Sequence, residues 1–175
     1  MNQFKEKLIE KDEQLSAWIY QKGRNKLVRI LTFIIAHSAD PHIWMGVSGA
    51  FWFWGDAFMK EVMFRQFVLG FILMLCSSTL KYTFKRPRPE YPTASMYYVK
   101  KLDKYSLPSG HSVRVGTLII SIGQAIPFSL WLLIPWGTAI LISRLTSGAH
   151  HVFDVSAGFL FGSIATGIII CFWTI

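Results

Sequence analysis

Residues 143–154 read SRLTSGAHHVFD and set Arg144, His150, His151 and Asp154 beside long apolar runs. If the segment from His150 onward is helical, Asp154 lies one turn above His150 on the same helix face. A carboxylate in that position can bind one ring nitrogen and leave the other as a free, more basic nucleophile. His151, three residues before Asp154, satisfies a similar argument. The stretch therefore predicts an oriented histidine without choosing between the two.

The composition predicts a membrane protein. Apolar residues make up 52% of the 175 residues and aromatic residues 15%, which is more than one soluble core of this size needs. The Lys and Arg residues gather in residues 1–29 and 81–104, with nearly uncharged runs between these clusters. We therefore expect one all-α, polytopic membrane domain over residues 1–175. The net charge of +8 indicates contact with phosphate or anionic lipid rather than with nucleic acid, because no basic-aromatic fingerprint is present.

The apolar runs predict about six transmembrane helices after an amphipathic one. Residues 1–25 mix apolar and charged residues at helical spacing, as in a helix at the membrane interface, although a solvated helix has the same pattern. The first two runs are short and are expected as a hairpin of tilted spans. An even number of spans puts both termini on one side of the membrane. The six runs are 27–38, 42–58, 62–84, 109–126, 129–147 and 151–174.

Charge alone does not orient these spans. The basic N-terminus favours a cytoplasmic location, yet the loop 86–107, expected on the opposite side, is basic as well. We expect the charges of this loop to serve anion binding, which makes it an extracytoplasmic loop.

Two basic residues, Lys81 and Arg88, stand seven residues apart where the third run ends. They can clamp a phosphoryl group, with Arg88 giving paired hydrogen bonds and Lys81 a point charge. Basic side chains that snorkel at a helix end have the same pattern.

The segment Pro108-Ser109-Gly110-His111 opens the fourth run. A helix N-terminus presents unpaired N–H groups and binds anions, and Gly110 lets a ligand approach the backbone closely. Ser109 can cap the helix and donate its hydroxyl, while His111 is placed to protonate a leaving group. The alternative is a plain serine cap followed by a surface histidine.

Together, the three clusters resemble the signature of the type 2 phosphatidic acid phosphatase (PAP2) superfamily, which also includes vanadium-dependent haloperoxidases. Every motif position in residues 81–154 is matched. The resemblance also selects His150 over His151, because the nucleophile of the family follows the signature arginine after five intervening residues. The matching residues are Lys81-x6-Arg88-Pro89, Pro108-Ser109-Gly110-His111 and Ser143-Arg144-x5-His150-x3-Asp154.

The resemblance implies a membrane lipid phosphatase. His150 would attack phosphorus and become a phosphohistidine with Asp154 orienting it, and His111 would protonate the departing lipid oxygen and then activate water. The family works without a metal, and no other cluster here has metal-ligand spacing, so no cofactor is expected. The groups expected to hold the phosphate are Lys81, Arg88, Ser109, the Gly110 N–H and Arg144.

Arg114, one helical turn after His111, is not explained by the signature. It is expected either to contact a second phosphate, a sugar or a headgroup, or to form a structural ion pair, for example with Asp154 or an acidic residue of the loop. Lys100, Lys101 and Lys104 of the loop are expected either to recruit an anionic headgroup or simply to be solvated.

The motif residues are expected to bind the phosphate group and not the lipid, so they do not identify which lipid phosphate is the substrate. Candidates are phosphatidate or phosphatidylglycerophosphate, undecaprenyl diphosphate, and lipid A 1-phosphate or a similar glycolipid. The compact chain suggests a bacterial or archaeal plasma-membrane enzyme with its active site on the extracytoplasmic side. A phosphotransferase with the same intermediate and a non-catalytic lipid-phosphate binding or transport protein are the alternatives. The sequence leaves the oligomeric state undetermined.

Overall fold

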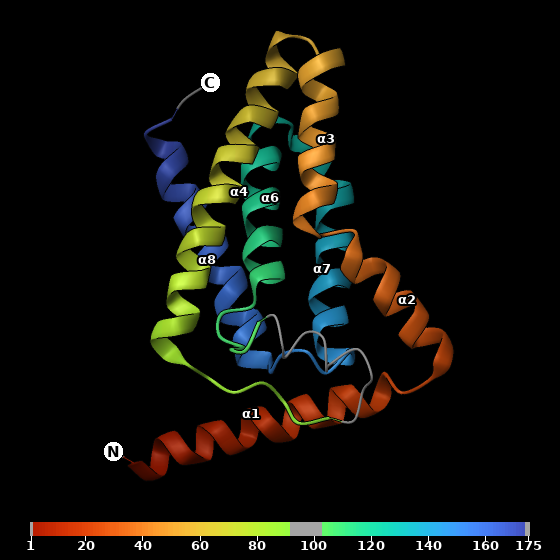
Figure 1. Cartoon of the computed structure of the whole chain (residues 1–175), viewed down its shortest axis with the longest axis vertical. Coiled ribbons are helices and arrows are strands. Elements are labelled where there is room, and N and C mark those ends of the chain that lie inside the picture. Colours follow the sequence, from red (N-terminus) through yellow and green to blue (C-terminus); the bar gives the residue numbers. More distant parts are fainter. Residues whose placement is uncertain (1, 92–102, 174–175) are drawn as a thin grey trace.

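The computed structural model describes residues 2–91 and 103–173, and all regular structure in these ranges is helical. One helix lies across one end of a bundle formed by the others (Figure 1). The elements are α1 (Asn2–Lys22), α2 (Lys26–His37), α3 (Pro41–Trp54), α4 (Ala57–Phe84), α6 (Gly110–Ala125), the short 3-10 helix η1 (Pro127–Ser129), α7 (Leu130–Thr146) and α8 (Val152–Cys171). The all-α prediction is confirmed. Residues 92–102 of the expected loop, including Lys100 and Lys101, lie outside the described residues.

Within the described ranges, three segments are long and apolar enough to cross a membrane: α4, η1 with α7, and α8. Their outer faces carry large apolar side chains, whose exposure to water costs free energy and whose contact with lipid does not. Examples with about half or more of the side chain exposed are Phe71, Leu75, Leu132, Ile134, Leu160 and Ile164. The structure thus supports an integral membrane protein.

The expected hairpin in residues 27–58 is wrong. α2 and α3 follow one another from the α1 end toward the opposite end, with α2 packed on α7 and α3 on α4 (Figure 1). Their 12 and 14 residues correspond to about 18 and 21 Å, so neither alone spans a hydrocarbon core of about 30 Å, whereas the two in series can. The helix breaks before Pro41, because proline disfavours helical geometry in the residue that precedes it.

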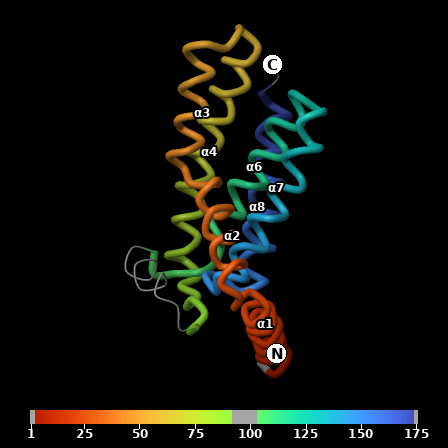
Figure 2. The backbone as a smooth tube through the Cα atoms, turned by 90° about the vertical axis from the view of Figure 1, so that its right-hand side faces the viewer, coloured from red at the N-terminus to blue at the C-terminus, as the bar shows by residue number. Residues whose placement is uncertain are grey.

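This path changes the predicted topology. The N- and C-termini lie at opposite ends of the bundle, and α1 shares its end with the connection from α4 to α6 (Figure 1). The prediction that both termini lie on one side is therefore wrong, and a count of six spans is not borne out. Seen from the side, α3 and α4 form one layer and α6, α7 and α8 another (Figure 2).

The helix α6 lies at the centre and packs most closely on α8. Glycines allow this approach: a Cβ added to Gly162 would lie 2.1 Å from the Val113 carbonyl oxygen, and one added to Gly158 would lie 2.6 Å from that of Ser109. The Ser109 N–H donates to the Asp154 carbonyl at 3.0 Å. Backbone contact thus fixes the start of α6 against the start of α8.

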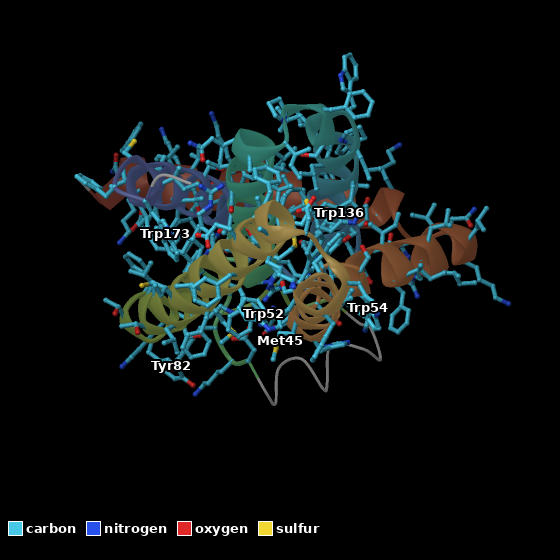
Figure 3. All side chains as sticks on the ribbon, turned by 90° about the horizontal axis from the view of Figure 1, so that it is seen from above. Met45, Trp52, Trp54, Tyr82, Trp136 and Trp173 are labelled. Carbon is cyan, nitrogen blue, oxygen red and sulfur yellow. The ribbon has the colours of Figure 1, made fainter. Side chains whose placement is uncertain are left out.

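Aromatic side chains mark the end of the bundle opposite α1. Phe53, Trp54 and Trp131 are each more than three-quarters exposed there. Figure 3 looks onto this end, with Trp54 and Trp173 on different sides of the bundle. Exposed indole and phenyl rings at one level are typical of a membrane–water interface.

Candidate active site

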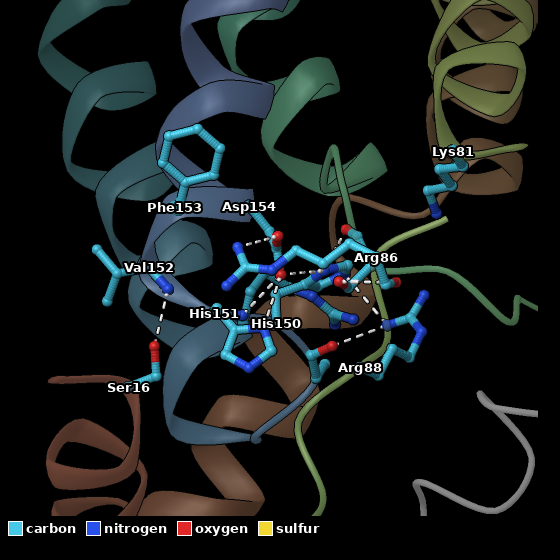
Figure 4. A network of polar contacts seen from close by, with 12 residues as sticks. Ser16, Lys81, Arg86, Arg88, His150, His151, Val152, Phe153 and Asp154 are labelled. Carbon is cyan, nitrogen blue, oxygen red and sulfur yellow. Dashed lines mark hydrogen bonds and ion pairs between the residues drawn. The ribbon is translucent and has the colours of Figure 1, made fainter. Parts of the chain in front are cut away.

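The motif residues meet at the α1 end of the bundle, where α4 and α7 end and α6 and α8 begin (Figure 4). Arg88 Nη1 donates to the Ala149 carbonyl at 2.8 Å and lies 3.3 Å from His150 Nε2. Lys81, Arg88, His150 and Asp154, which are separated by up to 73 positions in the chain, therefore lie in one neighbourhood. His150 is 3% exposed and Lys81 is 9% exposed, so the site is largely shielded from solvent.

The imidazole of His150 is held by a backbone carbonyl. Its Nδ1 lies 2.9 Å from the Ser106 carbonyl oxygen, which can only accept, so Nδ1 carries the proton and Nε2 keeps its lone pair. That lone pair faces Arg88. Burial lowers the pKa of His150 well below its usual value, and the nearby positive charges of Arg88 and Arg144 lower it further. His150 is thus a neutral imidazole whose Nε2 lone pair accepts from Arg88.

Asp154 supports this segment in a way the sequence did not predict. α8 begins at Val152 with His151 as its N-cap, so the assumed helical relation between His150 and Asp154 does not exist. Asp154 Oδ2 accepts from the His151 backbone N–H at 2.9 Å and lies 3.2 Å from His151 Nδ1, whereas His150 Nδ1 is 3.9 Å away. Asp154 therefore fixes the backbone next to His150 rather than its ring.

Arg86 and helix α1 complete this network: the sequence predicted the amphipathic helix in residues 1–25, but not its contact with the site or the role of Arg86. Arg86 donates to Asp154 Oδ1 at 2.8 Å and to Asp12 Oδ2 at 2.5 Å. Asp12 Oδ1 accepts from the Phe153 N–H at 2.9 Å, and Ser16 Oγ accepts from the Val152 N–H at 3.0 Å (Figure 4). Side chains of α1 therefore cap α8, although 136 positions or more separate them in the chain. In the sequence, Asp12 reads only as one more charge on an amphipathic helix.

Several donors in this region have room for an anion. Ser109 stands at the N-cap of α6 but makes no capping hydrogen bond, so the plain-cap alternative is wrong. Among the described residues, Ser109 Oγ and Arg144 Nε are two of nine buried side-chain N or O atoms without a hydrogen-bond partner, so both are free to donate to a ligand. A Cβ added to Gly110 would meet open space, so a ligand can reach the first N–H groups of α6.

An acidic side chain occupies the space between the first two cations. Asp103 Oδ2 contacts Lys81 Nζ and lies 2.7 Å from Arg88 Nη2, and the Asp103 carbonyl accepts from Arg88 Nε at 2.7 Å. A carboxylate bound in this way has the charge and the oxygen acceptors of a phosphoryl group. The Asp103 side chain is 41% exposed, so it is reachable from solvent. Among the described residues, no three His, Cys, Asp or Glu side chains gather as metal ligands would.

His111 and Arg114 both reach the break between α2 and α3. His111 Nε2 lies 3.0 Å from Asp40 Oδ1, and Arg114 donates to the Ala39 carbonyl. An ion pair between Arg114 and Asp154, one of the alternatives for this residue, is not formed, because Asp154 pairs with Arg86. Asp40 is a second residue that sequence reasoning missed.

An apolar groove leads toward this site between α3 and α4. Its volume is about 270 Å³, and its lining includes Trp44, Phe67, Phe71 and Arg114. A smaller pocket shares Arg114 with it and extends to Gly110, the neighbour of His111. The groove on the apolar flank of the bundle and the small pocket at the start of α6 are therefore neighbours, with Arg114 lining both.

Comparison with known proteins agrees with this geometry. A family model described as the PAP2 superfamily matches residues 64–174. Mouse sphingosine-1-phosphate phosphatase 1 is 30% identical over 121 residues, which are 63% of this chain but 27% of that protein. The chain thus spans about a quarter of that relative's length. The probable lipid phosphate phosphatase beta of Arabidopsis thaliana is 27% identical over 141 residues, covering 62% of this chain and 66% of that protein.

Two solved structures share the fold. A PAP2-type phosphatidylglycerolphosphate phosphatase from Bacillus subtilis superposes with a TM-score of 0.70 over 94% of this chain and 85% of that one, at 18% identity. LpxE from Aquifex aeolicus gives a TM-score of 0.68 over 90% and 93%, also at 18% identity. Since the family model covers more than half of the chain and contains all three motifs, this membrane protein belongs to the PAP2 superfamily.

Proposed function

We propose that the protein hydrolyses a lipid phosphomonoester or diphosphate through a phosphohistidine on His150. The observation that carries this proposal is the pairing of a buried, neutral His150 Nε2 with Arg88 at 3.3 Å. A neutral imidazole whose other nitrogen is fixed by the Ser106 carbonyl has the state that a nucleophile needs. Arg88 then binds the phosphate oxygens and frees the Nε2 lone pair to attack.

In the proposed reaction, Nε2 of His150 attacks phosphorus while His111 gives its proton to the departing lipid oxygen. His111 next takes a proton from water, which attacks the phosphohistidine and releases phosphate. The cations Lys81, Arg88 and Arg144 stabilise the charge that spreads over the phosphoryl oxygens. Ser109 Oγ and the N–H of Gly110 add hydrogen bonds, and the partnerless Ser109 hydroxyl supports this role.

The groove between α3 and α4 supports a lipid as the substrate. This apolar groove of about 270 Å³ has room for part of one hydrocarbon chain. Burying a chain there is favourable by roughly 0.8 kcal/mol per CH₂ group. The phosphate would then lie at the start of α6, beyond Arg114. The relative named for sphingosine 1-phosphate adds that lipid to the candidates, and the solved structure named for phosphatidylglycerolphosphate supports one of those already considered.

We further propose that the α1 end faces the extracytoplasmic side of a bacterial or archaeal plasma membrane. This orientation places the four Lys residues of α1 outside, against the positive-inside rule, although four acidic residues balance them. Part of the charge at this end is accounted for by the site: Lys81, Arg86 and Arg88 all make ion pairs there.

A phosphate-release screen of the purified protein in detergent micelles tests the function. The substrates are phosphatidate, phosphatidylglycerophosphate, sphingosine 1-phosphate, undecaprenyl diphosphate and a lipid A 1-phosphate. We expect release from at least one of them, undiminished in EDTA and blocked by vanadate, which mimics five-coordinate phosphorus. Release that requires added metal, or no release from any lipid, contradicts the proposal.

A further inference from the structure

Asp40 carries a contact that the PAP2 signature does not include. Its carboxylate Oδ1 lies 3.0 Å from His111 Nε2 and joins the break between α2 and α3 to the first turn of α6. The two side chains are only 19% and 22% exposed, so solvent screens the interaction weakly.

The carboxylate of Asp40 is not used to cap its own helix. Asp40 stands at the N-cap of α3, directly before Pro41, where an aspartate usually accepts a hydrogen bond from the first helical turn. Here it makes no side-chain capping bond. A cap of this kind normally stabilises a helix by about 1 kcal/mol, so the turn of this side chain toward His111 forgoes that stabilisation.

Three donors from different helices fix the turn that presents Asp40. Trp44 Nε1 donates to the Ser38 carbonyl at 3.2 Å, and Trp136 Nε1 donates to Ser38 Oγ at 3.0 Å. Arg114 donates to the Ala39 carbonyl, and Ala39 is fully buried. A backbone held from α3, α6 and α7 keeps the carboxylate in one position.

The charges around His111 explain what this carboxylate contributes. Burial lowers the pKa of His111, and the positive charges of Arg144 from α7 and Arg114 from α6 lower it further. His150 of the connection between α7 and α8 also lies nearby. Asp40, itself flanked by His37 and His42, is the negative group that favours the protonated ring. A general acid among such cations needs a counter-charge to keep its proton.

We propose that Asp40 is a positioning residue for the general acid His111 in the phosphatase reaction proposed above. It accepts from Nε2–H, so Nδ1–H faces the leaving oxygen and gives up its proton as the P–O bond breaks and the P–N bond to His150 forms. Nδ1 then takes a proton from the attacking water, and the His111 imidazolium is restored. Asp40 stays ionised throughout and moves no proton itself.

Asp40→Asn tests this role because it keeps the size of the side chain and removes its charge. We expect kcat to fall about 10- to 100-fold with little change in KM, and the basic limb of the kcat–pH profile to move to lower pH, because the acid loses its proton more readily. Asp40→Glu should recover part of the activity. The matched control is Asp56→Asn, since Asp56 caps α4 at the opposite end through the Met59 N–H at 2.8 Å; its kcat and pH profile should match those of the wild type.

An unchanged pH profile in Asp40→Asn overturns the proposal, whether or not kcat falls, because a purely structural role would lower kcat and Tm without moving the limb. A readout without turnover separates this test from that of the phosphatase activity. The NMR titration of His111 in the substrate-free protein should shift to lower pH in Asp40→Asn and stay unchanged in Asp56→Asn. No shift there overturns the pairing even if the wild type releases phosphate.

Discussion

Asp103 should compete with the phosphate of the substrate. Its Oδ2 contacts Lys81 and lies 2.7 Å from Arg88, the two cations proposed to hold the phosphoryl oxygens. An incoming phosphate must displace this carboxylate before it can bind both side chains. Replacing Asp103 with Ala removes the competing oxygens and leaves the backbone bond from Arg88 Nε to the residue 103 carbonyl in place.

The size of the effect follows from the exposure of Asp103. Hydrogen bonds to buried charges contribute about 1.5–3 kcal/mol each, whereas exposed ion pairs contribute about 0.2–1 kcal/mol. With the Asp103 side chain 41% exposed, its two contacts together stabilise the position of this carboxylate by about 1–2 kcal/mol. Removing them should therefore tighten anion binding by about 5- to 30-fold.

The assay is inhibition of phosphate release by vanadate in Asp103→Ala, with a thermal melt to verify folding. Glu90→Ala is the control, because it removes one exposed acidic group from the same connection between α4 and α6. We expect the inhibition constant to fall in Asp103→Ala and to change little in Glu90→Ala. Equal or weaker vanadate binding in Asp103→Ala, in a folded protein, refutes the idea that this carboxylate occupies the phosphate position.

Two further predictions concern His150 and the orientation in the membrane. Because burial holds the pKa of His150 well below 6.5, unfolding lets it bind a proton at acidic pH, so His150 makes the protein less stable as pH falls below about 6.5. Tm should drop less between pH 7.5 and 5.5 in His150→Gln than in the wild type, and an equal drop contradicts the buried neutral imidazole. For the orientation, single cysteines replace the exposed Lys85 and Trp54 in a chain without Cys76 and Cys171. An impermeant thiol reagent applied to intact cells should label the cysteine at position 85 and not that at position 54; the reverse pattern places the site in the cytoplasm.

Much of the fold and of the site could be predicted from residues that are close together in the sequence. Runs of apolar residues predicted α4, α7 and α8 close to their observed bounds, because a membrane-spanning helix needs only length and apolar composition. They did not predict the direction of the two short runs before α4. An end-to-end pair and a hairpin have the same hydropathy, and only packing on α7 and α4 distinguishes them.

The residues that the sequence missed have in common that their partners are distant in the chain. Asp40 meets His111 across 71 positions, and Arg86 meets Asp12 across 74. Each acidic residue has an ordinary local explanation, as a helix cap or as a charge on an amphipathic helix, so nothing nearby in the sequence marks it. Asp154 shows the opposite case: its spacing from His150 suggested a direct contact, but α8 begins two residues too late for a helical one.

The central claim is that His150, and not His151, is the nucleophile. Removing one ring or the other tests this claim, because the two rings have different partners. Asp154 contacts the ring of His151 at 3.2 Å, while the ring of His150 lies beside Arg88. The closer contact of Asp154, at 2.9 Å, is to the His151 backbone N–H and survives in His151→Ala.

The measurement is phosphate release from the best lipid substrate by His150→Ala and His151→Ala, each verified as folded by its thermal melt. We predict that His150→Ala releases no phosphate and that His151→Ala keeps much of the wild-type rate. Release that survives in His150→Ala, or an equal loss in both variants, would contradict the account.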